Sequence, residues 1–161
     1  RCLVGSEMCI RDSCVGIDPD HKRLPKHLFE CDKPYFEFGK AIVDATAAYV
    51  CAFKPQAAHF AAAAREDELA LLIAYVKKHY PDLQVLLDAK RGDVGSTAKL
   101  YAKEAFERYN ADAVTVSPYL GKTAWNLISN TQSAGLSSCV AQVIPAVTGC
   151  RTAGIKLLRS I

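Results

Sequence analysis

Residues 85–97 read Val-Leu-Leu-Asp-Ala-Lys-Arg-Gly-Asp-Val-Gly-Ser-Thr, an apolar run that ends in closely spaced charges. The apolar run is continuous rather than alternating, which is typical of a parallel strand buried on both faces. Alternation would place Asp88 and Lys90 on one face, about 6.6 Å apart along the strand. Opposite charges at the end of an apolar strand are costly unless they bind each other or a ligand. The spacing leaves two interpretations open: a structural ion pair with a helix cap at Ser96, or a catalytic strand end.

The composition is that of a globular protein with one domain. The 161 residues are 50% hydrophobic and 23% charged, which suffices for a real core. A net charge of +3 without a basic and aromatic stripe argues against nucleic acid as a partner. No apolar run approaches the ~20 residues that cross a bilayer, and no signal-peptide core is evident, so we expect no membrane partner.

The seven cysteines lack the spacing of a metal site. None forms a Cys-x-x-Cys motif or pairs with histidine at zinc spacing, so the sequence predicts no metal. Cys14 and Cys51 fall in apolar runs, where a buried free thiol is the usual case. We therefore expect a reducing, cytoplasmic setting.

Four segments have the character of buried strands, and each ends in a polar or charged residue. They lie within residues 14–20, 50–56, 85–87 and 113–116 and end at Asp18, Lys54, Asp88 and Ser117. Proline follows Asp18 and Lys54 directly and stops each strand there. Each residue also has a structural interpretation, since Asp18 could form an Asx turn and Lys54 could be an edge lysine with a buried stem.

Helical periodicity separates these strands and predicts helices over residues 36–49, 66–80 and 96–109. Their predicted inner faces are Phe38, Ile42, Ala45 and Tyr49, then Leu69, Leu72, Ile73 and Val76, then Leu100, Tyr101, Ala105 and Phe106. Alternating strands and helices predict an α/β fold of the (β/α)8 TIM-barrel type, of which about the first four β/α units are present. A doubly wound sheet is the alternative, although no Gly-x-Gly-x-x-Gly follows any strand.

Four motifs occur together in a specific order. They are Gly16-Ile17-Asp18-Pro19, Phe53-Lys54-Pro55-Gln56, Asp88-Ala89-Lys90-Arg91-Gly92-Asp93 with Val94-Gly95-Ser96-Thr97, and Ser117-Pro118-Tyr119-Leu120-Gly121. Over about residues 14–122 the chain resembles the N-terminal half of orotidine 5′-phosphate decarboxylases of the longer bacterial type. The resemblance implies decarboxylation of orotidine 5′-monophosphate to UMP in pyrimidine biosynthesis, with no metal or organic cofactor.

The resemblance also implies roles for individual residues. Lys54, Asp88, Lys90 and Asp93 match the Lys-Asp-Lys-Asp array of the family. In that array Lys90 would protonate C6 of the pyrimidine as carbon dioxide leaves. Asp88 would lie beside the substrate carboxylate, while Lys54 would bind ribose and hold Asp88 in place. Preorganised charges of this kind favour the developing carbanion over the carboxylate.

Three further residues are implied to bind substrate: Asp18, Thr97 and Ser117. Asp18 would bind a ribose hydroxyl. Asp93 and Thr97 would reach the active site of the neighbouring subunit, so the resemblance implies a homodimer with shared sites.

Both ends of the chain depart from the family. Residues 1–13 look like adapter-derived sequence, and we expect a non-native leader there rather than a frayed native terminus. The family pattern stops after Lys122, where the family continues with Asp-Ser-Leu-Glu-Pro. Codons can be chosen that encode this chain from Lys122 onward and that also encode Asp-Ser-Leu-Glu-Pro when they are read from the last base of the Lys122 codon. We therefore expect 123–161 to be an out-of-frame tail rather than a divergent native one. The chain as written is then expected to be an inactive fragment, because the later strands and the phosphate-binding arginine have no counterpart.

Two other functions stay open from the sequence. A metal-dependent sugar-phosphate synthase of the same barrel type shares the Asp-x-Lys-x-x-Asp motif, although residues 53–56 argue against it. A non-catalytic fragment or binding module would keep the charged strand ends without turnover.

Overall fold

The structure, a computed structural model, describes residues 13–117, 139–142 and 156–158. The chain divides into two compact units, residues 1–85 and 86–161. Most of the predicted leader and of the predicted tail lies outside the described residues. Two short strands within 123–161, given below, are the exception.

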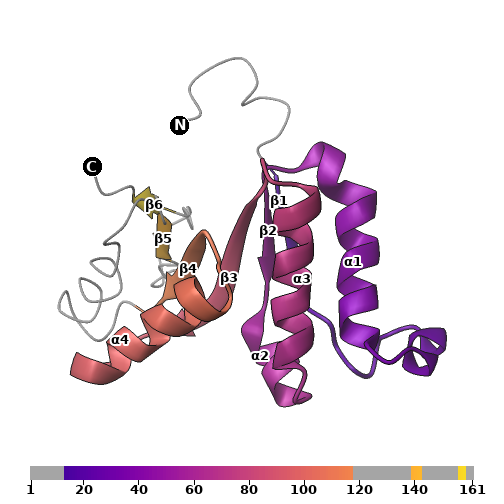
Figure 1. The fold of residues 1–161 in the computed structure, drawn as a ribbon, viewed down its shortest axis with the longest axis horizontal. Coiled ribbons are helices and arrows are strands. Elements are labelled where there is room, and N and C mark those ends of the chain that lie inside the picture. The colour runs from indigo at the N-terminus through magenta and orange to yellow at the C-terminus, as the bar shows by residue number, and fades with distance from the viewer. Residues whose placement is uncertain (1–12, 118–138, 143–155, 159–161) are drawn as a thin grey trace, which may run out of the picture. The chain divides into compact units, whose positions relative to one another are not determined.

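The first unit alternates strands with helices in the predicted order (Figure 1). Its elements are β1 (Cys14–Ile17), the 3-10 helix η2 (Lys26–Glu30), α1 (Pro34–Thr46), the 3-10 turn η3 (Ala47–Tyr49), β2 (Ala52–Pro55), α2 (Ala57–Ala62) and α3 (Glu66–His79). Strand β3 (Gln84–Arg91) begins in this unit and continues into the second. Strands β1 and β2 pair in parallel, and β2 pairs in parallel with the first two residues of β3. The predicted α/β alternation is confirmed.

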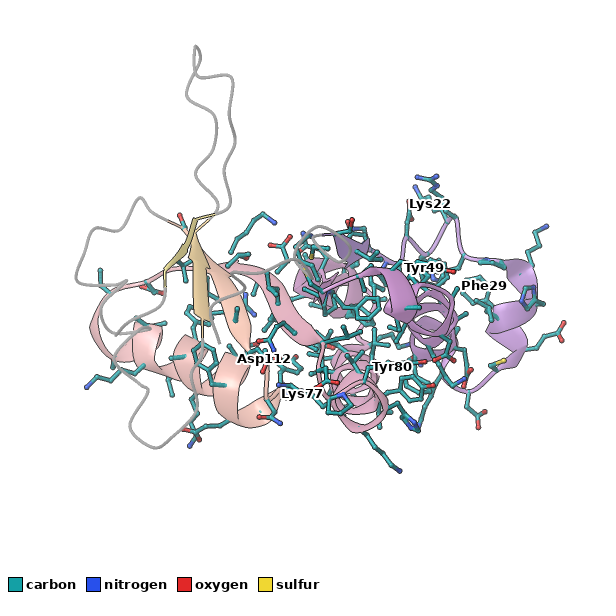
Figure 2. The ribbon with its side chains drawn as sticks, turned by 90° about the horizontal axis from the view of Figure 1, so that it is seen from above. Lys22, Phe29, Tyr49, Lys77, Tyr80 and Asp112 are labelled. Carbon is teal, nitrogen blue, oxygen red and sulfur yellow. The ribbon has the colours of Figure 1, made fainter. Side chains whose placement is uncertain are left out.

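Helices α1 and α3 lie side by side (Figure 1). The predicted inner face of α3 is confirmed, since its four apolar residues are buried. The predicted inner face of α1 is wrong: Tyr49 is 72% exposed (Figure 2), and the helix buries Tyr35, Gly39 and Val43. The reason is close approach, because a Cβ on Gly39 would come within 2.5 Å of a methyl group of Leu72. Gly39 therefore lies at the contact with α3, on the face of the helix that also buries Tyr35 and Val43.

A buried carboxylate from α3 caps the start of α1. Glu68 is 4% exposed, and its Oε2 accepts hydrogen bonds from the backbone N–H groups of Tyr35 (2.8 Å) and Phe36 (2.9 Å). These two groups have no partner within the helix, because the first turn of any α-helix leaves its N–H groups unpaired. Arg65 Nη1 lies 3.1 Å from the other oxygen of Glu68 and balances its charge.

A second carboxylate joins α1 and α3 at the surface. Asp44 Oδ1 accepts hydrogen bonds from the hydroxyls of Tyr75 (2.7 Å) and of Tyr80 (2.9 Å), which is labelled in Figure 2. Lys40 Nζ lies 3.2 Å from Asp44 Oδ2. Loss of hydration would raise the pKa of Asp44, but these hydrogen bonds outweigh it and the pKa is lowered. The hydrogen bond to Asp44 in turn raises the pKa of Tyr75 to about 12.

The second unit continues β3 and adds a helix and three strands. Its further elements are α4 (Gly95–Lys103), the π-helical turn η4 (Glu104–Arg108), β4 (Ala113–Val116), β5 (Cys139–Gln142) and β6 (Lys156–Leu158). Strand β4 pairs in parallel with β3 and β5, and β6 pairs antiparallel with β5.

Helix α4 differs from its prediction in two respects. Leu100 was expected on the inner face but is 65% exposed, and the helix buries Ala98 and Ala102. Ala105, in the following turn η4, is buried as predicted. The buried residues of α4 are thus small ones, where larger ones were expected. Ser96 was a candidate helix cap, but the cap position is Val94, and no side chain caps the helix.

The described cysteines Cys14, Cys31 and Cys51 are free thiols. The expectation that Cys14 and Cys51 are buried is wrong, since the first is exposed and the second half-buried. Cys14 begins β1, which pairs only with β2 among the described strands, and this leaves its other edge uncovered by them. Among the described helices, none has the length and hydropathy of a membrane span.

Candidate active site

The end of β3 brings two opposite charges together. Lys90 Nζ donates a hydrogen bond to Asp88 Oδ1 at 2.7 Å, and the two side chains are 56% and 7% exposed. A buried carboxylate is thus paired with an ammonium group that reaches solvent. An ammonium carries three N–H donors, so one bond to Asp88 leaves two for a ligand.

A residue of β4 completes the surroundings of Asp88. The Thr115 hydroxyl, which is 1% exposed, donates to Asp88 Oδ1 at 2.7 Å. The hydroxyl oxygen of Thr115, Oγ1, also accepts hydrogen bonds from the backbone N–H groups of Ala89 (3.1 Å) and Lys90 (3.0 Å). The sequence prediction omitted Thr115. The signal for it was present, since Thr115 is the one polar residue in the strand Ala-Val-Thr-Val.

The next residue anchors the strand end to helix α4. Arg91 donates from Nε and Nη2 to the two carboxylate oxygens of Glu104, at 3.0 and 2.9 Å. Its guanidinium lies 4.8 Å from the centre of the Tyr101 ring. The Ser117 backbone N–H donates to the Arg91 carbonyl at 2.8 Å, so the predicted residue Ser117 lies beside the end of β3.

The other two predicted residues of this unit follow β3 directly. Asp93 Oδ1 accepts the backbone N–H of Val94 at 2.7 Å, and Gly95 then takes a left-handed conformation with φ of 57°. Thr97 lies in the first turn of α4 and is half-buried. The second unit thus contains five of the predicted site residues. Four lie in β3, the loop after it and the start of α4, and the fifth, Ser117, follows β4 directly.

Asp18 and Lys54 lie together at the carboxyl ends of the paired strands β1 and β2. Gly16 stands opposite Lys54 in the ladder. A Cβ on Gly16 would come within 3.9 Å of both Asp18 Oδ1 and Lys54 Nζ. The two charged groups therefore approach the same small space above a glycine. The Asx turn that was an alternative for Asp18 is formed by Asp20, whose Oδ1 accepts the N–H of Lys22 at 3.0 Å.

A separate cleft lies in the first unit, between the loop after β1 and helix α2. Its volume is about 660 Å³, and aromatic and basic side chains contribute to its walls. They include Phe29, Tyr35, His21, His59 and Arg65. Neither Asp18 nor Lys54 lines it, so it is distinct from the predicted residues of this unit. Within the part of the chain that the structure describes, no three His, Cys, Asp or Glu side chains cluster as metal ligands would.

The sequence model of the orotidine 5′-phosphate decarboxylase / HUMPS family matches residues 13–134. The chain belongs to this family. Its strand-end residues Asp18, Lys54, Asp88, Lys90 and Ser117 all fall within the matched range.

Curated relatives carry the name orotidine 5′-phosphate decarboxylase. The protein from Ralstonia nicotianae is 64% identical over 108 residues, which are 67% of this chain and 40% of that protein. The protein from Dechloromonas aromatica is 60% identical over 109 residues, 68% of this chain and 40% of its own length. The chain therefore spans about two fifths of the length of these relatives.

Solved structures agree with this assignment. The OMP decarboxylase of Leishmania donovani superposes with a TM-score of 0.67 at 32% identity, covering 84% of this chain and 50% of that chain. The UMP synthase of the same organism gives a TM-score of 0.67 at 32% identity and is covered over 28% of its length. The predicted fold, the first part of a (β/α)8 barrel, and the predicted family are both confirmed.

Proposed function

We propose that the whole protein to which these residues belong decarboxylates orotidine 5′-monophosphate to UMP. The observation that carries the proposal is the Asp88–Lys90 pair, a buried carboxylate under a half-exposed ammonium at the end of a parallel strand. Active sites of α/β barrels form at this end of their strands. The names of the curated relatives support the same reaction.

In the proposed reaction, the bond between C6 and the carboxylate carbon breaks, and carbon dioxide leaves without the electron pair. That pair remains on C6, and the Lys90 ammonium transfers a proton to it as the general acid. Water returns a proton to Lys90 afterwards. The charge of Asp88 next to the substrate carboxylate and the ammonium of Lys90 near C6 favour the product side of this step.

The remaining predicted residues have binding roles in the proposal. Lys54 and Asp18 bind ribose hydroxyls, which is consistent with their approach to one space above Gly16. Ser117 contacts the substrate beside the end of β3. Asp93 and Thr97 serve the site of a second subunit, so the working assembly is a homodimer. The reaction as proposed uses no metal or organic cofactor, and the free thiols are consistent with a cytoplasmic enzyme.

The experiment uses an enzyme of full family length. In the grafted enzyme, residues 13–117 of this chain replace the matching segment of the Ralstonia nicotianae protein. We expect the grafted enzyme to decarboxylate orotidine 5′-monophosphate in the presence of a chelator. The unaltered Ralstonia protein is the control, and the 161-residue chain assayed alone is expected to be inactive.

Each other outcome contradicts one part of the proposal. An inactive grafted enzyme beside an active control would show that residues 13–117 do not supply a decarboxylase half. Activity that requires added metal and a sugar phosphate would favour the synthase alternative. Turnover by the 161-residue chain alone would overturn its description as an inactive fragment.

We also propose that residues 123–161 are translated out of frame and that residues 1–13 are foreign. The family match runs past residue 122 to residue 134, so the junction needs a direct test. Nucleotide sequencing of several independent clones across codon 122 provides it. A missing base in this clone alone is expected, whereas the same uninterrupted reading frame in every clone would establish a native tail.

A further inference from the structure

The ladder between β3 and β4 breaks at the candidate active site. Leu87 pairs with Val114 and Arg91 pairs with Val116, so the three residues from Asp88 to Lys90 stand opposite a single residue, Thr115. Such a bulge leaves backbone groups of the longer strand without their usual partners in the ladder. Unpaired backbone N–H groups in a partly buried position are destabilising, so the bulge requires another acceptor.

The Thr115 hydroxyl is that acceptor, and its bonding capacity is completely used. A hydroxyl can donate one hydrogen bond and accept two. Thr115 Oγ1 accepts from the N–H groups of Ala89 and Lys90, so its own proton is directed to the third neighbour, Asp88 Oδ1. One side chain therefore holds both the backbone of the bulge and the carboxylate that emerges from it.

The backbone of Lys90 also needs support. The φ angle of Lys90 is 46°, in the left-handed region of backbone conformation that residues other than glycine seldom adopt. The left-handed turn ends the regular alternation of side chains between the two faces of the strand. Beyond it, the Lys90 ammonium lies 2.7 Å from Asp88 Oδ1. Strained residues of this kind persist only where the surroundings hold them, and they cluster at functional sites. The hydrogen bond from the Lys90 N–H to Thr115 is such a restraint.

We propose that Thr115 is a positioning residue for the Asp88–Lys90 pair. Its hydroxyl orients the Asp88 carboxylate and fixes the left-handed turn that places the Lys90 ammonium. The inference rests on the proposed decarboxylase function and adds a residue to it. Packing does not explain the hydroxyl, because valine would fill the same space in this strand without a buried polar group.

The test compares two substitutions at this position in the grafted enzyme. Thr115→Val keeps the shape and removes the hydroxyl, and Thr115→Ser keeps the hydroxyl and removes a methyl group. We expect Thr115→Val to lower kcat by about 10- to 100-fold with KM changed less than about threefold, because a hydrogen bond to a charged group is lost from the reacting array. Thr115→Ser should stay within about threefold of the parent kcat.

Thr46→Val is the matched control. The Thr46 hydroxyl donates to the Ile42 carbonyl at 2.7 Å inside α1, so this variant removes the same group from a helix of the other unit. Its kcat should equal that of the parent. A Thr115→Val enzyme with normal kcat would overturn the inference. So would equal losses in the Val and Ser variants, because these would indicate packing.

A second measurement does not depend on activity. In the 161-residue chain, hydrogen exchange of the Ala89 and Lys90 amides should be slow with Thr115 or Ser and about tenfold faster or more with Val. If the grafted enzyme is inactive while exchange follows this pattern, the proposed function fails and the positioning geometry stands. Unchanged exchange in the Val variant would overturn the positioning role regardless of activity.

Discussion

Glu68 and Asp88 are two buried carboxylates, one in each unit, and their surroundings differ. They are 4% and 5% exposed, and each has a basic side chain within about 3 Å. The remaining donors to Glu68 are backbone N–H groups at the start of α1. Asp88 instead accepts a hydrogen bond from the hydroxyl of Thr115, which also holds a distorted strand end.

This difference separates a structural carboxylate from a candidate catalytic one at equal burial. The donors to Glu68 belong to a helix that must be capped in any folded state of this unit, so its charge is used to stabilise the fold. Asp88 instead balances an ammonium that is half-exposed and has two N–H groups besides the one bonded to Asp88. Burial and charge pairing alone would rank the two sites as equals, whereas the identity of the donors distinguishes them.

The largest expected effect is at Lys90. In the grafted enzyme, Lys90→Ala should lower kcat by at least about 1,000-fold, because the proposed general acid is removed. Lys103→Ala is the control, since it removes a lysine from an exposed ion pair with Glu107 in the same unit. Steady-state kinetics together with circular dichroism check the result. A folded, dimeric Lys90→Ala enzyme with near-normal turnover would show that Lys90 is not the acid.

Glu68 should show the opposite pattern, a loss of stability without a loss of chemistry. Glu68→Ala leaves two N–H groups of α1 without an acceptor and should lower the free energy of unfolding by about 2–4 kcal/mol. Glu68→Gln keeps one acceptor oxygen and should cost about 1–2 kcal/mol. Urea unfolding of the 161-residue chain measures both. A reduced kcat in folded Glu68→Gln grafted enzyme would contradict the distinction drawn between the two carboxylates.

The smallest expected effect is at Asp44, which is a surface carboxylate with three donors. Its pKa is lowered, so its stabilising effect is present above the ordinary value of 3.8 and is lost as the pH falls below that. The pKa of Tyr75 is raised from 10.0 to about 12, so the shared hydrogen bond is lost as the pH rises through that interval. Asp44→Asn should therefore reduce the free energy of unfolding between the low-pH limit set by Asp44 and the high-pH limit set by Tyr75. Outside these two limits, parent and variant should be equally stable.

Two measurements check the expectation for Asp44. Urea unfolding of parent and variant as a function of pH gives the range of pH over which Asp44 stabilises the fold. Ultraviolet titration of tyrosine should show one group near pH 12 in the parent that moves towards its ordinary value in Asp44→Asn. Identical titration curves would mean that Asp44 does not perturb Tyr75.

Sequence patterns predicted the strands and α3 well because their signals are local. Continuous apolar runs closed by proline defined β1 and β2, and apolar residues at helical spacing defined the buried face of α3. The faces of α1 and α4 were mispredicted because hydrophobicity was taken as the guide. Gly39 and Ala98 are buried instead, and at Gly39 the absence of a side chain allows the close approach of Leu72.

The candidate site divides in the same way. The amino-acid sequence by itself determined which charged residues end which strands, and its motifs determined the family, because both are carried by neighbouring residues. Only the tertiary structure revealed Thr115 beside Asp88 and Glu68 at the start of α1, partners 27 and 33 residues distant in the chain. No local pattern specifies such contacts, since they form only when separate strands and helices pack together. The left-handed turn at Lys90 belongs with them, because the acceptor for its N–H lies on another strand.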